Sequence, residues 1–157
     1  MKRYICLDLF EEHPNVNLYT IRFLEDEKSL FDRFLEKHET PEFEAELQMI
    51  THWLDKIGQF GALERFFRPE GHPMVKAIPL FSSYAGLRLY CFRLSDSILI
   101  LGGGKQKMVK KFQEDSELQF HVEVVKKSGL QLLKAIDQGR IRKARYLYGN
   151  LTFKIEL

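Results

Sequence analysis

The sequence of 157 residues lacks most of the patterns that would identify a metal centre or a membrane segment. Its two cysteines, Cys6 and Cys91, lie far apart without metal-ligand spacing, so we expect reduced thiols in a cytoplasmic protein. The five histidines are scattered and form no His-x-x-x-His pair, so we expect no metal and no other cofactor. No apolar run approaches the length of a membrane span and no N-terminal secretion signal is recognisable, so we expect no membrane association.

Familiar catalytic motifs are also missing. The segment Gly102-Gly103-Gly104-Lys105 has neither the spacing of a phosphate-binding loop nor the Ser or Thr that follows its lysine. There is no Gly-x-Ser-x-Gly sequence and no other support for a serine or cysteine nucleophile. The sequence therefore contains no recognisable set of residues that would support the function of an ordinary small-molecule enzyme.

The chain has the length of one domain, residues 1–157, and 45% of its residues are hydrophobic. Alternating apolar residues predict strands, and apolar residues three and four apart predict helices. The strands are expected at 3–10, 17–24, 75–80, 87–94, 97–101 and 151–157, and the helices at 25–37, at 41–58 and from Ser116, with a break near Gly129. This order predicts an α+β domain with helices on one face of an antiparallel sheet.

Charge is unevenly distributed along the chain. Residues 1–60 hold seven Lys or Arg and thirteen Asp or Glu, whereas residues 61–157 hold seventeen and nine. A basic run also extends from Arg140 to Arg145. If this asymmetry persists on the surface, the C-terminal half attracts a polyanion, and we expect RNA. The alternative is that solvated helices differ in composition.

The most distinctive cations surround the predicted strands at 75–101. Lys76 and Arg88 lie in two of these strands, and Lys105, Lys107, Lys110 and Lys111 follow the third. Antiparallel pairing is expected to bring these side chains together into a groove that holds a phosphate backbone. Alternatively, lysines at sheet edges serve only to prevent aggregation.

Three segments here resemble toxins of the RelE/HigB type from toxin–antitoxin pairs. They are Lys76-Ala-Ile-Pro-Leu, the stretch from Ala85 to Phe92 around Arg88, and the apolar strand from Ile98 that ends in glycines and Lys105-Gln-Lys107. The resemblance covers residues 18–113 and implies two N-terminal helices packed on a curved antiparallel sheet. Residues 115–157 are then a C-terminal extension with further helix and a final strand.

The resemblance implies a metal-independent endoribonuclease that cuts mRNA on the ribosome and inhibits translation. Arg88, Lys76 and Lys105 would be catalytic: Arg88 stabilises the phosphorane, and a lysine whose pKa is lowered by neighbouring cations assists proton removal. Lys107, Lys110, Lys111 and Tyr84 would bind RNA. His121 is a further acid or base candidate, although a solvated helix histidine is the commoner case.

Three positions depart from the toxin pattern. Phe112 stands where many members have Tyr, Gln106 where an Arg is expected, and Pro79 or Ile78 where a second basic residue often lies. These departures favour a second hypothesis, a non-cleaving binding module. A third hypothesis is a related toxin of the ParE type that acts on gyrase. Either toxin implies a cognate antitoxin protein, whose acidic or amphipathic segment covers the basic groove.

Overall fold

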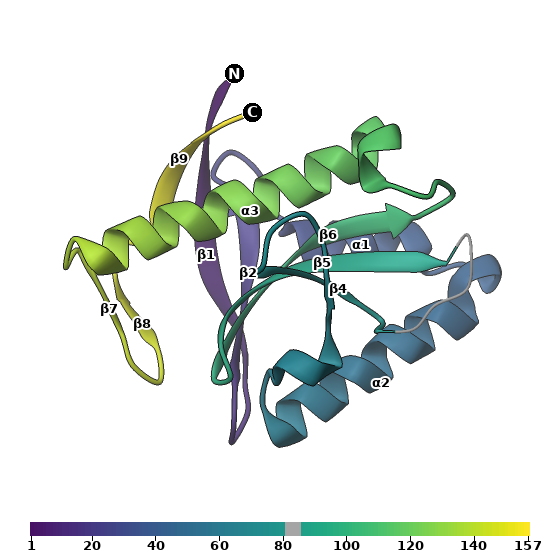
Figure 1. The fold of residues 1–157 in the computed structure, drawn as a ribbon, viewed down its shortest axis with the longest axis horizontal. Coiled ribbons are helices and arrows are strands. Elements are labelled where there is room, and N and C mark those ends of the chain that lie inside the picture. Colours follow the sequence, from purple (N-terminus) through teal and green to yellow (C-terminus); the bar gives the residue numbers. More distant parts are fainter. Residues whose placement is uncertain (81–85) are drawn as a thin grey trace.

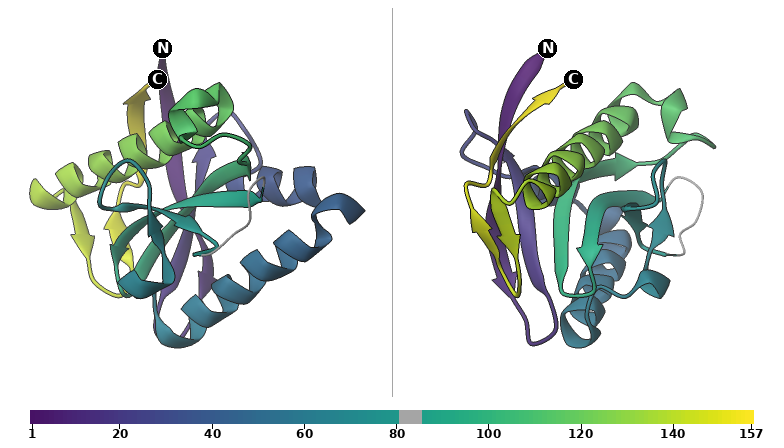
Figure 2. Two further views of the ribbon diagram at one scale, coloured as in Figure 1. Left: turned by 45° about the vertical axis from the view of Figure 1, so that its right-hand side comes forward. Right: turned by 60° about the vertical axis from the view of Figure 1, so that its left-hand side comes forward.

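The computed structural model describes residues 1–80 and 86–157, which form a mixed sheet with helices on both faces (Figures 1 and 2). The strand order is β3-β4-β5-β6-β2-β1-β9. Neighbouring strands are antiparallel except for β2 and β6, which are parallel. The strands are β1 (Lys2–Glu12), β2 (Asn17–Phe23), β3 (Arg68–Pro69), β4 (Val75–Ile78), β5 (Leu87–Ser95), β6 (Ile98–Gln106) and β9 (Thr152–Glu156).

Helix α3 (Ser116–Asp137) covers one face of this sheet, and α1 (Leu30–His38) and α2 (Glu44–Phe60) cover the other. A separate hairpin, β7 (Ile141–Lys143) and β8 (Leu147–Gly149), follows α3 and extends away from its C-terminal end (Figure 1). Short 3-10 turns are formed by Pro41–Phe43, Glu64–Phe66 and Phe112–Glu114.

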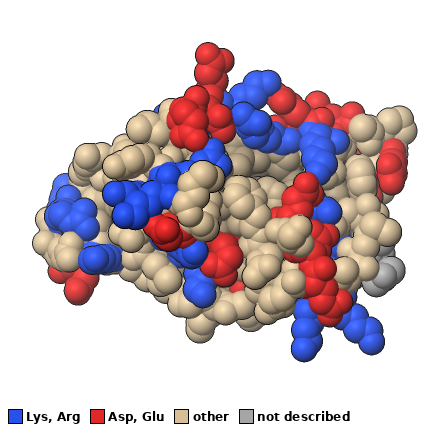
Figure 3. Space-filling model, turned by 90° about the horizontal axis from the view of Figure 1, so that it is seen from above, with Lys and Arg blue, Asp and Glu red and all other residues tan. Residues whose placement is uncertain are grey.

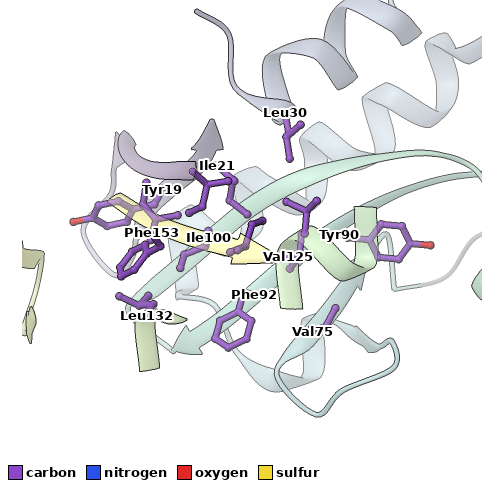
Figure 4. Packing of buried hydrophobic residues seen from close by; sticks show 14 of the residues in the cluster. Tyr19, Ile21, Leu30, Val75, Tyr90, Phe92, Ile100, Val125, Leu132 and Phe153 are labelled. Carbon is purple, nitrogen blue, oxygen red and sulfur yellow. The ribbon is translucent and has the colours of Figure 1, made fainter. Parts of the chain in front are cut away.

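Alternation along β5 supplies both hydrophobic cores. Leu89 and Cys91 belong to the core on the α1 and α2 side, whereas Tyr90 and Phe92 belong to the core under α3. Figure 4 shows Phe92, Val125 and Ile100 in this second core, with the Tyr90 hydroxyl directed away from it. Because successive strand side chains point to opposite faces, Arg88 lies on the α3 side of the sheet.

The expected fold, two N-terminal helices on an antiparallel sheet, is wrong. Two strands, β1 and β2, precede the helices, and the seven-stranded sheet is mixed because β2 pairs in parallel with β6. The segment expected to be an extension supplies α3, which covers a whole face of the sheet, and β9, which pairs with β1. The structure is therefore a mixed α/β arrangement with a helical layer on each face.

Most individual strands lie where alternation predicts them. The strand expected at 97–101 is longer than predicted and continues to Gln106 as β6. The first helix begins at Leu30, after the Ser29 side chain accepts a hydrogen bond from the Asp32 amide, and not at residue 25. The predicted break near Gly129 is wrong, because α3 continues to Asp137. A Cβ atom at Gly129 would lie 2.1 Å from the Phe92 ring, so glycine here allows close packing of helix on sheet.

We therefore predict that Gly129→Ala destabilises the fold although alanine is the better helix former. The added methyl group would force Phe92 or α3 to move, at a cost of about 1–3 kcal/mol in the free energy of unfolding. Urea unfolding followed by circular dichroism measures it, with Gln119→Ala at an exposed position of α3 as the control. A Gly129→Ala protein as stable as the Gln119→Ala protein would contradict this packing.

Candidate functional site

The three expected catalytic cations do not all lie on the same face of the sheet. Arg88 of β5 pairs directly with Lys105 of β6, so these two side chains share the α3 face. Lys76 of β4 pairs with Cys91, whose side chain lies in the core on the α2 side. The structure therefore brings Arg88 and Lys105 together and places Lys76 on the opposite face.

Lys76 makes a structural ion pair. Its side chain is 6% exposed, and its Nζ donates to Glu64 Oε2 at 2.8 Å. The hydrogen bond from Lys76 lowers the pKa of Glu64, which also binds Arg93 at 3.1 Å. These contacts connect the turn Glu64–Phe66 to the sheet.

Lys105 connects the end of β6 to the start of α3. Its Nζ lies 3.0 Å from Asp115 Oδ2 and 3.2 Å from Glu117 Oε2. The other Asp115 oxygen accepts hydrogen bonds from the amides of Glu117 and Leu118 and so caps the helix. The hydrogen bond to Asp115 raises the pKa of Lys105. The expectation that neighbouring cations lower this pKa is wrong, because the neighbours are carboxylates, and Lys105 stays protonated.

The glycines before Lys105 serve helix packing. A Cβ atom at Gly102 would lie 2.3 Å from Val125 Cγ2, and one at Gly103 would lie 2.8 Å from His121 Nδ1. Larger side chains at these two positions would therefore push α3 away from β6. Helix packing thus explains why glycines follow the apolar part of this strand, and this explanation is independent of phosphate binding.

Arg88 has a different environment from the lysines around it. It is 5% exposed, and its Nη1 donates weakly to the carbonyl oxygens of Gly86 at 3.4 Å and Leu87 at 3.3 Å. Among the described residues, its Nε is buried without a hydrogen-bond partner and no carboxylate forms an ion pair with Arg88. Residues 81–85, outside the described ranges, are Phe-Ser-Ser-Tyr-Ala and contain no acid. Burial and then the neighbouring Arg68 lower the pKa of Arg88.

Two further groups complete this site. Tyr90, two residues along β5, is fully buried, and its hydroxyl has no hydrogen-bond partner in the part of the chain that the structure describes. Burial raises the pKa of Tyr90, so the phenol stays protonated. Glu70 influences both Arg88 and Tyr90 electrostatically and pairs with Lys107 at 3.2 Å. We call Arg68, Glu70, Arg88, Tyr90 and Lys107 the Arg88 cluster.

The remaining expected RNA-binding residues are distributed unevenly. Lys107 is 11% exposed and held by Glu70, whereas Lys110 and Lys111 are exposed before α3. Tyr84 lies outside the described residues. Phe112, one of the departures from the toxin pattern, is buried in the core under α3. It lies beside Gly71 and shares this core with Val122 of α3. The lysines thus split into one that is paired and two that face solvent.

Sequence reasoning missed Glu70, Asp115 and the Tyr90 hydroxyl as parts of the site. Glu70 stands in a Pro-Glu-Gly segment with no periodicity, and its partner Lys107 is far away in sequence. Asp115 lies directly before the Ser116 that was expected to begin the helix, so its capping position was detectable. Blue and red side chains are interspersed on the face of the molecule that Figure 3 shows, so no uniform basic groove is present on that face.

Among the described residues, no three His, Cys, Asp or Glu side chains are grouped so as to hold a metal ion. Within the same parts of the chain, no helix combines the length and apolar character required to cross a membrane. Comparisons with family models, with curated proteins and with solved structures found no match to this chain.

His121, the other acid or base candidate, lies against β6 and does not face the Arg88 cluster. Among the described residues its Nδ1 is buried without a hydrogen-bond partner, and burial lowers the pKa of the imidazole to about 4. The partly buried ring lines a cavity of about 270 Å³ together with Lys37, Glu117 and Phe120. The imidazole is therefore neutral at pH 7.

We predict that this imidazole makes the fold less stable in mild acid. In the unfolded chain its pKa is about 6.5, so the unfolded state binds the proton first as the pH falls. Between pH 7.5 and pH 5 the free energy of unfolding should therefore drop by on the order of 2 kcal/mol. Urea unfolding at several pH values measures this slope.

His121→Leu should flatten the slope, leaving the part due to His38, whose pKa is also lowered by burial. His52→Leu, at an exposed position of α2, is the matched control and should keep the wild-type slope. Parallel profiles for the wild-type and His121→Leu proteins would show that the imidazole is not desolvated.

Proposed function

We propose that this chain is a toxin that cleaves mRNA and inhibits translation in the cytoplasm, with Arg88 binding the scissile phosphate. The observation that carries the proposal is the buried Arg88 guanidinium, with which no carboxylate of the described residues forms an ion pair. A desolvated cation without a counter-charge costs folding free energy, and binding of an anion removes that cost. The planar fork of donors on a guanidinium matches two phosphate oxygens.

The resemblance of the segments around Lys76, Arg88 and Lys105 to RelE/HigB-type toxins supports RNA as the source of this phosphate. It supports the function only, because the fold expected from it is wrong. In this reaction the 2′-hydroxyl of the RNA attacks the adjacent phosphorus and the 5′-oxygen leaves, so negative charge accumulates on the phosphorane. Arg88 stabilises that charge, and the neighbouring Lys105 and Lys107 are paired with Asp115 and Glu70.

Lys76 has no part in this chemistry, because it lies on the opposite face and neutralises Glu64. Lys110 and Lys111 are exposed beside the cluster and are suited to hold the RNA backbone. The uncompensated guanidinium is also a natural target for the antitoxin. We propose that an acidic antitoxin segment places a carboxylate against Arg88 and so excludes RNA.

One observation favours a second function, a module that binds RNA without cleaving it. The carboxylates of Glu70, Asp115 and Glu117 pair with Lys107 and Lys105, which leaves Arg88 and Arg68 as cations of this site without an ion pair among the described residues. Such a module would inhibit translation without producing mRNA ends. The same experiment therefore distinguishes the two functions.

We predict that Arg88→Met abolishes activity without harming the fold. Methionine keeps an apolar stem but removes the desolvated charge, so the free energy of unfolding should stay the same or rise. Induced expression in bacteria should arrest growth for the wild-type chain and not for Arg88→Met. Primer extension on cellular mRNA should show new 5′-hydroxyl ends for the wild-type chain alone.

Lys76→Met is the matched control, since it removes an equally buried cation from the other face of the sheet. It should retain growth arrest and mRNA cleavage wherever the protein remains folded. Growth arrest without new mRNA ends would favour the binding module. Full arrest by Arg88→Met, or a wild-type chain that neither arrests growth nor cuts RNA, would contradict the proposal.

A further inference from the structure

The hairpin formed by β7 and β8 is strongly basic. Residues 138–150 include four cations and no Asp or Glu, and these cations are Arg140, Arg142, Lys143 and Arg145. All four are exposed. We call residues 138–150 the basic hairpin. In Figure 3, blue side chains predominate at the left end, where the end of α3 and the hairpin lie in Figure 1.

The hairpin is held firmly to the rest of the molecule on its inner side. Ile141 and Leu147 are 2% and 7% exposed and belong to the core under α3. The Leu147 amide donates to the Tyr19 hydroxyl at 2.9 Å, and Asn17 Nδ2 donates to the Arg145 carbonyl at 2.7 Å. This anchoring fixes the position of the outer side chains, so a partner that binds them meets an ordered surface.

These cations lack the carboxylate partners that several cations of the sheet have within the described parts of the chain. Within the described parts of the chain, no ion pair joins any of the four to a carboxylate. Lys76, Arg93, Lys105 and Lys107 are all paired. Four like charges kept together without counter-charges repel one another, and a polyanion relieves that repulsion.

Aromatic rings are interleaved with these charges. Arg142 is the direct cross-strand neighbour of Tyr148, and its guanidinium lies 4.4 Å from the ring centroid. Arg145 lies 5.9 Å from the ring of Tyr146, and the two tyrosine rings are 6.1 Å apart. The Tyr146 hydroxyl binds Glu12, whereas Tyr148 is 44% exposed. Cations beside an exposed aromatic ring suit an unpaired nucleotide strand, in which phosphates meet the cations and bases stack on the rings.

We propose that the basic hairpin is a docking surface for single-stranded RNA, separate from the Arg88 cluster. The two surfaces belong to opposite ends of α3: the cluster adjoins its N-terminal end, and the hairpin follows its C-terminal end. The choice of RNA over DNA rests on the proposed function, whereas the preference for a single strand rests on the exposed tyrosine. The hairpin holds a strand and so raises its local concentration around the molecule.

Fluorescence anisotropy of the full chain with a labelled oligouridylate of about 12 nucleotides tests this proposal. Arg142→Gln/Arg145→Gln removes two exposed cations and should weaken binding about tenfold at moderate salt. It should also reduce the slope of log K against log salt by about 1.4, because each lost contact to a single strand contributes about 0.7. Tyr148→Leu should weaken binding about tenfold through the loss of one stacked base.

Lys2→Gln/Arg65→Gln is the control, because it removes two exposed cations far from the hairpin and changes the net charge equally. It should bind RNA like the wild type. An equal loss in this control, or unchanged binding by the hairpin variants, would overturn the proposal. Equal or tighter binding of duplex RNA or of an oligothymidylate would overturn it as well. The proposal would also fail if polyglutamate displaced the RNA equally well from the wild-type protein and from the Tyr148→Leu protein.

The outcome is independent of the proposed cleavage. Arg88→Met should keep RNA binding by the hairpin while it loses growth arrest. Loss of hairpin-dependent binding with growth arrest retained would refute the docking surface alone. Absence of mRNA cleavage with tight, hairpin-dependent binding would refute the nuclease alone.

Discussion

The close contact between α3 and the sheet is the constraint on which the rest of the structure depends. Gly102 and Gly103 of β6 and Gly129 of α3 occupy positions where a side chain would collide with the opposite element. This approach allows Asp115, at the start of the helix, to cap α3 and bind Lys105 at the same time. The helix thereby closes one side of the Arg88 cluster and, at its other end, leads into the basic hairpin.

The contrast between neighbouring cations gives the cluster its chemical character. Lys105 and Lys107 each have a carboxylate within ion-pair distance, whereas Arg88 is more deeply buried. Within residues 1–80 and 86–157, the partners of Arg88 are backbone carbonyl oxygens, and its Nε has none. Stability alone does not favour such an arrangement, because a desolvated charge without a counter-charge is costly. Its retention is understandable if an anion binds there, and a phosphate fits the planar donors of a guanidinium.

Local patterns in the sequence were sufficient for most strands and for the amphipathic helices, since alternation and helical periodicity depend only on which face is buried. The order of layers was not predictable in this way. The parallel pairing of β2 with β6 and the return of β9 to β1 join segments distant in sequence, and no local signal encodes them. Likewise the strand was expected to end at residue 101, yet Gly102 and Gly103 lie within β6 and line the helix–sheet contact. Arg88 was singled out from the sequence, but its lack of an ion-pairing carboxylate among the described residues depends on three-dimensional neighbours.

The most direct test of the Arg88 cluster is observation of the guanidinium itself. The Arg88 Nε–H resonance can be followed by ¹⁵N NMR, and assigned by its absence from the Arg88→Met protein, during titration with a 2′-O-methyl dinucleotide that cannot be cleaved. We expect this resonance to shift in a saturable manner while the Arg93 resonance, held by Glu64 on the other face, stays in place. An unchanged Arg88 resonance at nucleotide concentrations that shift other residues would contradict the assignment of Arg88 as the phosphate-binding group.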